Sequence, residues 1–343
     1  MFQPYHYIGL DIHKRTVSFC EKRADGKEIA SGTFRADVAS VTQWAMERTM
    51  PWVGGMEATI FAGYIYDTLS PFAAELLVGH PLSIKAISAA KHKNDSVDAE
   101  TLSNLLRADL FPESYMASSQ VRALRRALRF RNFLVRMAVN MKNRTTGILM
   151  ETGIPYDGKR IHGKQYFRDF LGNLDDTPEF VSKMLVTNRA LLDLFEQAQA
   201  ELLKALSTHD DLCERVMRLT SIRGVGEVTA LTWALEIDDP WRFSNIKKVQ
   251  SYCGLCSGQN ESGGVSKRAP LSRQRNANLQ HCLIEAAKLA PQWNEQLRAV
   301  RTKSLEQNKN RNRATCAVAR KLVAYLMAVD KSGKDFEILT PAR

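Results

Sequence analysis

Four acidic residues stand where a protein can build a site for divalent cations. Asp11 and Glu57 each end a short run typical of a β-strand, and Asp95 and Asp98 open a run with helical periodicity. Aspartates three residues apart share one face of a helix's first turn. Carboxylates gathered in one place repel each other, and two Mg²⁺ ions about 3.5 to 4 Å apart would neutralise them and assist an in-line phosphoryl displacement.

Each of these acids also has a purely structural interpretation. An Asp-x-x-Asp pair at the start of a helix is an N-cap followed by an acidic third position. An acid that ends a strand is often simply solvated. The order and context of all four favour the metal site, with Asp11, Glu57, Asp95 and Asp98 as ligands.

A second group of residues with chemical potential is the loop rich in small and polar residues after Leu255. A hydroxyl of Ser257, Ser262 or Ser266 could attack a phosphate, but no histidine lies close in sequence to act as a base. The residue types therefore do not choose among the three serines.

The segments that must position the acids alternate between strand and helix patterns. We expect strands at 5–11, 16–21, 29–34, 52–56 and 76–79, and helices at 38–48 and 65–74. Three strands in a meander followed by alternating helices and strands predict an α/β fold, with a mixed sheet covered by helices. This pattern is typical of the ribonuclease H fold.

A helix without any acid is expected from Val121 to Met150. A solvated face normally mixes charge signs, so this helix favours phosphate binding over the alternative of a solvated face. The basic residues that we assign to nucleic acid here are Arg122, Arg125, Arg126, Arg129, Arg136, Lys142 and Arg144.

The rest of the chain is expected to be mostly helical. After a linker at 153–172, a long amphipathic helix at 177–206 would pack within the chain or form a coiled coil between protomers. We therefore predict a first domain at 1–157 that ends in the basic helix, a linker and long helix at 158–210, and a mostly α-helical second domain at 211–343.

Gly224 and Gly226 precede a helical run in the second domain. Such a turn exposes backbone N–H groups, as helix-hairpin-helix modules do when they bind a phosphate, although tight turns before helices are common. Further basic residues assigned to nucleic acid lie in the serine loop and near the end of the chain: Lys267, Arg268, Arg311 and Arg313.

Charge and composition restrict the partner and the compartment. The 343 residues carry 48 Lys and Arg against 37 Asp and Glu, a net charge of +11, which indicates a polyanionic partner: nucleic acid, or a membrane surface as the rival. We expect no membrane span and no signal peptide. Six dispersed cysteines predict reduced thiols in a cytoplasm, and the Cys253–Cys256 pair lacks a second pair for zinc.

Three segments resemble the Asp-Glu-Asp-Asp signature of a family of insertion-sequence transposases. They are GLDIHK around Asp11, GMEAT around Glu57 and KNDSVDAE around Asp95 and Asp98. This family includes the Piv pilin-gene invertases and the bridge-RNA-guided recombinases. The resemblance implies a first domain like the RuvC Holliday-junction resolvase, in which these four acids bind Mg²⁺.

Three further segments resemble the second domain of that family: SIRGVG, RFSNIKKVQSYCGL and the Glu-Ser-Gly at 261–263. This resemblance implies that Ser262 is the nucleophile and forms a covalent phosphoserine link with DNA. It also implies donor and target DNA as substrates, a structured guide RNA from the same element, a homo-oligomer (dimer or tetramer) and a nucleoid-associated place in a bacterial cytoplasm.

Two other functions fit the same residues. In a RuvC-like hydrolytic nuclease, such as a junction resolvase, the acids would work without Ser262. In a non-catalytic nucleic-acid-binding protein, the acids would be structural and the basic surface would carry the function. A covalent protein–DNA adduct separates the transposase from both alternatives.

Overall fold

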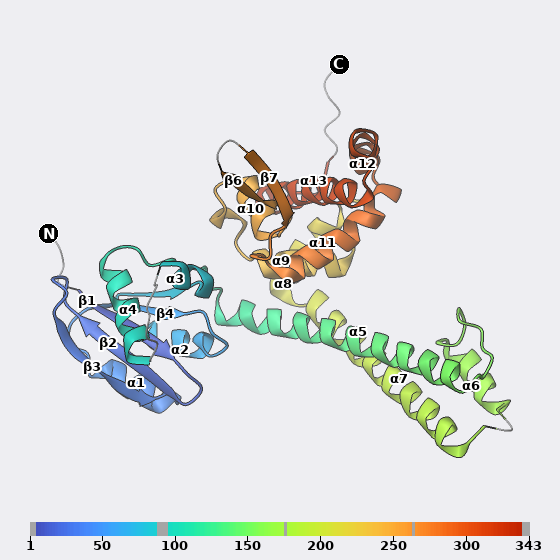
Figure 1. Ribbon diagram of the computed structural model, residues 1–343, viewed down its shortest axis with the longest axis horizontal. Helices are drawn as coiled ribbons and strands as arrows, with labels where there is room; N and C mark the ends of the chain where they lie inside the picture. Colours follow the sequence, from blue (N-terminus) through green and yellow to red (C-terminus); the bar gives the residue numbers. More distant parts are fainter. Residues whose placement is uncertain (1–4, 88–94, 175–176, 263–264, 338–343) are drawn as a thin grey trace. The chain divides into compact units, whose positions relative to one another are not determined.

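The computed structural model describes residues 5–87, 95–174, 177–262 and 265–337 (Figure 1). The chain divides into two compact units, an amino-terminal unit, Met1–Ser119, and a carboxy-terminal unit, Gln120–Arg343. The basic helix thus groups with the second unit, whereas the sequence suggested a first domain that extends to residue 157. None of the helices in the described segments combines the length and apolar character that a membrane crossing requires.

The amino-terminal unit is built on one mixed sheet in the order β3-β2-β1-β4-β5. Its strands are β1 (His6–Ile12), β2 (Thr16–Lys22), β3 (Glu28–Arg35), β4 (Trp52–Glu57) and β5 (Glu75–Gly79). The β1–β2 and β2–β3 pairs are antiparallel, and the β1–β4 and β4–β5 pairs are parallel. The predicted meander and mixed α/β sheet are confirmed.

The helices of this unit cover the sheet on both faces. They are α1 (Val38–Met46), α2 (Ala62–Leu69), α3 (Pro81–Ile87) and α4 (Asp95–Arg107). On one face, Ile8 and Leu10 of β1 are fully buried in a core with Trp44 of α1 and Ile65 of α2. Because side chains alternate along a strand, Gly9 and Asp11 face the other side, where α4 lies.

The helix expected at 65–74 begins earlier and ends earlier, as α2. Pro71 explains the early end, because it lacks the amide hydrogen that the next helical turn needs. Phe72 instead donates its backbone N–H to the carbonyl of Leu69 in a turn.

The carboxy-terminal unit begins with α5 (Ser119–Glu151), α6 (Lys164–Gly172) and α7 (Glu179–Ser207). The two long helices of this set, α5 and α7, lie side by side (Figure 1), and Leu149, Phe167 and Leu185 form a small core with α6. The basic helix and the long amphipathic helix are confirmed. The prediction of a linker at 153–172 is wrong for its last nine residues. Residues 164–172 form α6, which packs through the buried Phe167.

The remaining helices form the main core of this unit. They are α8 (Asp210–Thr220), α9 (Glu227–Ile237), η1 (Pro240–Arg242), α10 (Ile246–Tyr252), α11 (Ala277–Leu289), η2 (Ala290–Gln292), α12 (Glu295–Asn308) and α13 (Arg311–Ser332). Helix α9 is buried almost throughout, with Trp233 and Leu235 at its centre. The predicted helical character of this region is confirmed.

The segment predicted as a serine loop is instead a two-stranded antiparallel hairpin, β6 (Ser257–Ser262) and β7 (Val265–Leu271). Its small and polar residues have weak strand propensity, but backbone ladder hydrogen bonds do not depend on side-chain type. A loop prediction from composition was therefore wrong here.

Candidate active site

Asp11 and Glu57 lie at the carboxyl ends of neighbouring parallel strands, Asp11 as the last residue but one of β1 and Glu57 as the last of β4. The β1–β4 register pairs Leu10 with Met56, so Asp11 and Glu57 each follow the last pair by one residue. Since the two strands run in the same direction, both acids reach the same edge of the sheet. Both side chains are partly buried, with Asp11 14% exposed.

Helix α4 crosses the same face of the sheet at very close range because Gly9 has no side chain. A Cβ on Gly9 would lie 2.0 Å from the carbonyl oxygen of Ala99 and 2.5 Å from the backbone nitrogen of Ser103. Gly55, two residues before Glu57, faces the same helix, since a Cβ there would lie 3.0 Å from the side chain of Leu106. These glycines let α4 approach the two acid-bearing strands.

The direction of α4 brings its first turn toward Asp11. Ser103 donates its hydroxyl to the carbonyl of Tyr7 at 3.0 Å, and Ala99 lies against Gly9, so the helix runs antiparallel to β1. Four helical residues rise about 6 Å and two strand residues about 6.6 Å. Moving by this distance from the contact between Ala99 and Gly9 therefore leads to Asp95 along α4 and to Asp11 along β1.

Asp98 is half-buried in the first turn of α4, and Asp95 is the first residue of that helix. The side chain of Asp95 lies outside the described residues. Asp11 and Glu57 thus lie at one end of the sheet, and α4 runs so that its first turn points toward that end. The assignment of the four acids to one metal site stays a prediction.

A buried lysine fixes α4 against the sheet. The ammonium of Lys22 donates to Glu100 Oε1 at 2.7 Å and to Asn104 Oδ1 at 3.1 Å, both on α4. Lys22 is 6% exposed, so the pair is shielded from solvent on the lysine side. Together with the Gly9 contact, this pair sets the rotation of α4 and hence the position of its first turn.

His13 is a neighbour of the acids that sequence reasoning did not identify. Its Nε2 lies 3.0 Å from Asp11 Oδ2, and its side chain is half exposed. The signal in the sequence was its position two residues after Asp11, which places both side chains on one face of an extended segment. His13 can orient the Asp11 carboxylate through this contact.

Among the described side chains, no group of three or more His, Cys, Asp or Glu residues could hold a metal ion. The fourth predicted ligand, Asp95, is not among them. The donor set itself suits a hard divalent cation, because carboxylate oxygens are the ligands that Mg²⁺ prefers. By the chemistry of their donor atoms, the four acids suit such a cation.

The three candidate serines occupy different positions in the hairpin, with Ser262 and Ser266 on neighbouring rungs. Ser257 is the first residue of β6 and pairs with Leu271, and Ser262 is its last residue and pairs with Val265. Ser266 lies on β7 and pairs with Glu261 of β6. Ser262 therefore stands nearest the turn of the hairpin. The predicted nucleic-acid residues Lys267 and Arg268 lie on β7, paired with Asn260 and Gln259.

The base of this hairpin is anchored in the core. Ser272 donates its backbone N–H to the carbonyl oxygen of Cys256 at 3.1 Å, and Leu255 and Cys253 are fully buried. Burial raises the pKa of the Cys253 thiol to about 12, so this cysteine is a neutral packing residue. The anchored base carries Ser262 at the opposite end.

Two arginines of α5 bind groups of the protein itself. Arg129 donates from Nε and Nη2 to both oxygens of Glu236, at 2.9 and 2.8 Å. Arg125 donates from Nε to the carbonyl of Leu235. The sequence pattern did not predict these contacts, because Glu236 is more than 100 residues away in the chain.

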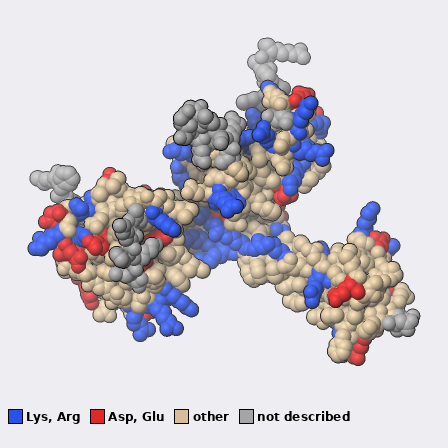
Figure 2. Space-filling view, in the orientation of Figure 1, with Lys and Arg blue, Asp and Glu red and all other residues tan. Residues whose placement is uncertain are grey.

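Three other arginines of the same helix remain available. Arg126, Arg136 and Arg144 are exposed and make no ion pair or side-chain hydrogen bond to another described residue. Lys and Arg gather along the amino-terminal half of α5 (Figure 2). Lys142, in contrast, forms an ion pair with Glu196 at 2.7 Å, and the Nε of Arg122 is buried.

The two predicted glycines before α9 have different structural roles. Gly224 has φ +95°, and a Cβ there would lie 2.6 Å from the Cβ of Ala290, so packing and backbone both require glycine. Gly226 caps α9 without any side-chain hydrogen bond, and a Cβ there would meet nothing within 4 Å. The open N–H groups at this helix start suit an anion.

Arg311 and Arg313 are exposed in the first turn of α13. Cations at this end oppose the helix dipole, which favours negative charge there. Both residues are accessible to a polyanion, and their assignment to nucleic acid stays a prediction.

Comparison with known proteins gives matches in both units. Residues 8–154 match the DEDD transposase family of the IS110 type, and residues 216–301 match the family described as Transposase IS116/IS110/IS902 family. The first match ends close to the predicted boundary at residue 157, whereas the compact unit ends at Ser119.

Two full-length relatives are similar over nearly the whole chain. The transposase for insertion sequence element IS1328 of Yersinia enterocolitica is 23% identical over 339 residues, which cover 96% of this chain and 98% of the relative. The transposase for insertion sequence element IS1111A of Coxiella burnetii is 26% identical over 336 residues, 94% of this chain and 88% of the relative.

Proposed function

Because this chain belongs to the IS110/IS116/IS902 family of insertion-sequence transposases and carries a DEDD transposase domain, we propose that it cuts and rejoins DNA through a phosphoserine link to Ser262. The observation that supports the proposal most is that Asp11 and Glu57 lie at the same end of adjacent parallel strands, with α4 packed across that face at Gly9. Such a set of acids suits phosphoryl transfer.

DEDD transposase domains use divalent metal ions, and we propose Mg²⁺ for this chain. Asp11, Glu57, Asp95 and Asp98 would hold it. When bound there, Mg²⁺ would supply Lewis-acid stabilisation of the charge that develops on the phosphate oxygens. His13 holds Asp11 in place, while Gly9 and Lys22 hold α4 so that its acids stay at the sheet edge.

Ser262 would conserve the energy of the broken bond. Its hydroxyl oxygen attacks phosphorus, a serine–phosphate ester forms, and the bond from phosphorus to the leaving sugar oxygen breaks. The proton of the serine hydroxyl is balanced by the one that the leaving sugar oxygen takes up. In the second step a sugar hydroxyl of the new partner strand attacks the ester and regenerates the serine.

The exposed cations support nucleic acid as the partner. Arg126, Arg136 and Arg144 on α5, with Arg311 and Arg313 on α13, are solvent-exposed and suit phosphate groups. We propose donor and target DNA as substrates, and a structured RNA of the same element as guide. Lys267 and Arg268, on the strand paired with that of Ser262, would contact the same nucleic acid.

Helix α7 supports a homo-oligomer. Phe180, Met184, Leu191 and Leu194 are between 36% and 75% exposed and follow the spacing of coiled-coil contact positions. We propose that this apolar row packs against the same row of a second copy of the chain, either in a dimer or in each of the two dimers that make up a tetramer.

The experiment that tests the proposal is the capture of a covalent protein–DNA adduct. A labelled DNA substrate that carries the end of the element is incubated with the full chain and Mg²⁺, then resolved under denaturing conditions. Label that migrates with the protein supports the phosphoserine mechanism, and cleavage without an adduct supports the hydrolytic nuclease.

A further inference from the structure

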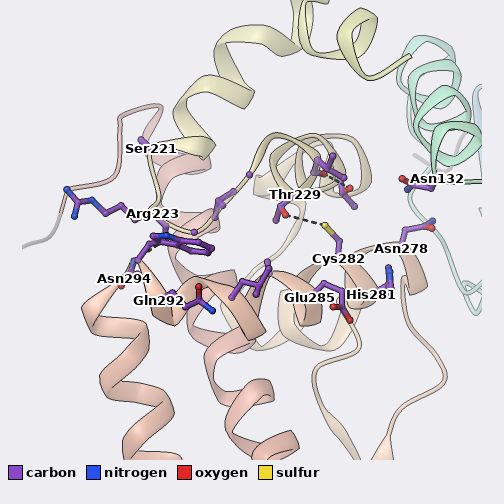
Figure 3. A pocket seen from close by; sticks show the side chains of 18 of the residues that line it. Asn132, Ser221, Arg223, Thr229, Asn278, His281, Cys282, Glu285, Gln292 and Asn294 are labelled. Carbon is purple, nitrogen blue, oxygen red and sulfur yellow. Dashed lines mark hydrogen bonds between the residues drawn. The ribbon is translucent and has the colours of Figure 1, made fainter. Parts of the chain in front are cut away.

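The carboxy-terminal unit contains a large pocket that the proposed chemistry does not use. It encloses about 1850 Å³ between α5, the turn before α9, α11 and the start of α12. Figure 3 shows Asn132 of α5, Thr229 of α9 and His281 of α11 around it. Its described lining includes neither the acids nor the β6–β7 hairpin. Sites for single small molecules occupy about 300 to 1000 Å³, so this volume suits a segment of a polymer.

The charge of the pocket favours a polyanion. Its lining contains four arginines, Arg131, Arg136, Arg223 and Arg298, against two glutamates. One of these glutamates, Glu285, is already paired with Lys288 at 2.6 Å. The guanidinium groups of Arg136 and Arg223 are exposed and form no hydrogen bond or ion pair with the described residues. The Arg136 and Arg223 guanidinium groups can therefore bind phosphates.

The pocket also presents an exposed aromatic ring. Trp293 is 55% exposed beside Leu289, which is 50% exposed, and both belong to the lining. An indole left open to solvent among arginines is the arrangement on which unpaired bases stack. A duplex offers phosphates but hides the faces of its bases in the stack, so it would not use this ring.

The start of α9 adds a place for a phosphate next to the ring and the arginines. Gly226 and Val228 line the pocket, and the helix start has no side-chain cap. Backbone N–H groups in the first turn can therefore bind a phosphate oxygen. The pocket thus combines surfaces for bases and for the backbone of one strand.

We propose that this pocket binds an unpaired strand of nucleic acid a few nucleotides long, with a base on Trp293 and phosphates at Arg136, Arg223 and the start of α9. The inference deepens the proposed function and rests on it for the presence of unpaired strands during strand exchange. Strand binding itself needs neither Ser262 nor the acids. The test therefore measures binding alone, in EDTA, so that a failure of the chemistry leaves its result unchanged.

The chain supplies a matched control for Trp293. Of its five tryptophans, Trp44, Trp52 and Trp233 are at most 5% exposed, while Trp241 is 68% exposed and lies outside the pocket lining. Full-length Trp293→Phe and Trp241→Phe are titrated with an oligothymidylate of about ten nucleotides, within the usual site size. We expect quenching of tryptophan fluorescence to persist in Trp241→Phe and to disappear in Trp293→Phe.

Affinity gives the second measurement. Trp293→Ala should weaken binding of the oligothymidylate about 5- to 150-fold, the range for loss of one stacked base, and leave duplex binding within about twofold. Trp241→Ala should change neither. Equal effects of both variants, no effect of Trp293→Ala, or equal loss of duplex binding would each overturn the proposal. Unchanged circular dichroism and thermal unfolding verify that the variants are folded.

Discussion

The Arg129 guanidinium donates two hydrogen bonds to Glu236, a carboxylate that is only 1% exposed. Asn276 and Asn278 of the α11 region donate to the same carboxylate, at 2.8 and 3.1 Å. Burial raises the pKa of Glu236, but the hydrogen bonds from Arg129 and Asn276 outweigh it and hold the pKa below its ordinary value. One buried charge therefore joins α5, α9 and α11.

Removal of this partner should destabilise the chain. Arg129→Ala leaves the Glu236 carboxylate buried without its cation, and we expect a loss of about 1 to 3 kcal/mol in the free energy of unfolding. Arg126→Ala, on the same helix but exposed and without a partner among the described residues, should change stability by no more than about 0.5 kcal/mol. Urea unfolding of both variants measures the difference.

The same pair determines how this difference changes with pH. A carboxyl whose folded pKa is depressed stabilises the fold above its unfolded pKa, and that stabilisation is lost as the pH falls through the folded pKa. The stabilisation of wild type by this carboxylate should be full above about pH 4.5, and the gap between wild type and Arg129→Ala should shrink as the pH falls below it. A gap of constant size would contradict the assigned role of Glu236.

The salt dependence of DNA binding should identify the arginines that contact phosphates. The triple substitution of Arg126, Arg136 and Arg144 by Gln should reduce the slope of log affinity against log salt by up to about 0.9 per lost duplex phosphate contact. Binding titrations at several salt concentrations measure this slope. An unchanged slope would assign this face of α5 to solvent.

Gly9 should be essential for the position of α4. Gly9→Ala would place a methyl group 2.0 Å from the Ala99 carbonyl oxygen, and backbone atoms cannot rotate away as a side chain can. We expect a loss of about 1 to 3 kcal/mol in stability and loss of strand transfer, with DNA binding largely retained. Gly147→Ala, in α5 with nothing within 4 Å, is the control and should not destabilise. Full strand transfer by Gly9→Ala would contradict the close approach.

The elements of the first unit were predictable because their apolar periodicity and their turns agree. The strand patterns at 5–11, 16–21 and 29–34 predicted the meander, and the structure confirms it. The end of α2 was missed although Pro71 signals it. The hairpin after Ser257 was missed because composition describes side chains, whereas the strands pair through their backbones.

The candidate site was only partly predictable from the sequence. The acids could be proposed because each stands at the end of an expected element, and Asp11 and Glu57 do lie near the carboxyl ends of adjacent parallel strands. The pairing of Arg129 with Glu236 could not be found, since no local pattern joins residues that far apart. A charge run shows that cations are present, but only the fold shows which of them are already paired.

The acids should be required for chemistry but not for binding. Asp11→Asn and Asp98→Asn keep the size of the side chain and remove a negative ligand, so strand transfer should be abolished while nucleic-acid affinity stays within about threefold of wild type. Strand-transfer assays with Mg²⁺ and binding titrations in EDTA measure the two properties separately. Recombination at the wild-type level by either variant would contradict the metal-site assignment.

The most direct measurement is the covalent adduct formed by each serine variant. Ser262→Ala should fold and bind DNA, because loss of one hydroxyl near the turn of a hairpin changes stability by about 0.5 kcal/mol at most, yet it should form no adduct. Ser257→Ala and Ser266→Ala, at the base of the hairpin and on its other strand, should still form one. A denaturing gel of labelled DNA decides between the two results. Adduct lost only in Ser262→Ala is the predicted outcome, and adduct retained in Ser262→Ala would contradict the phosphoserine mechanism.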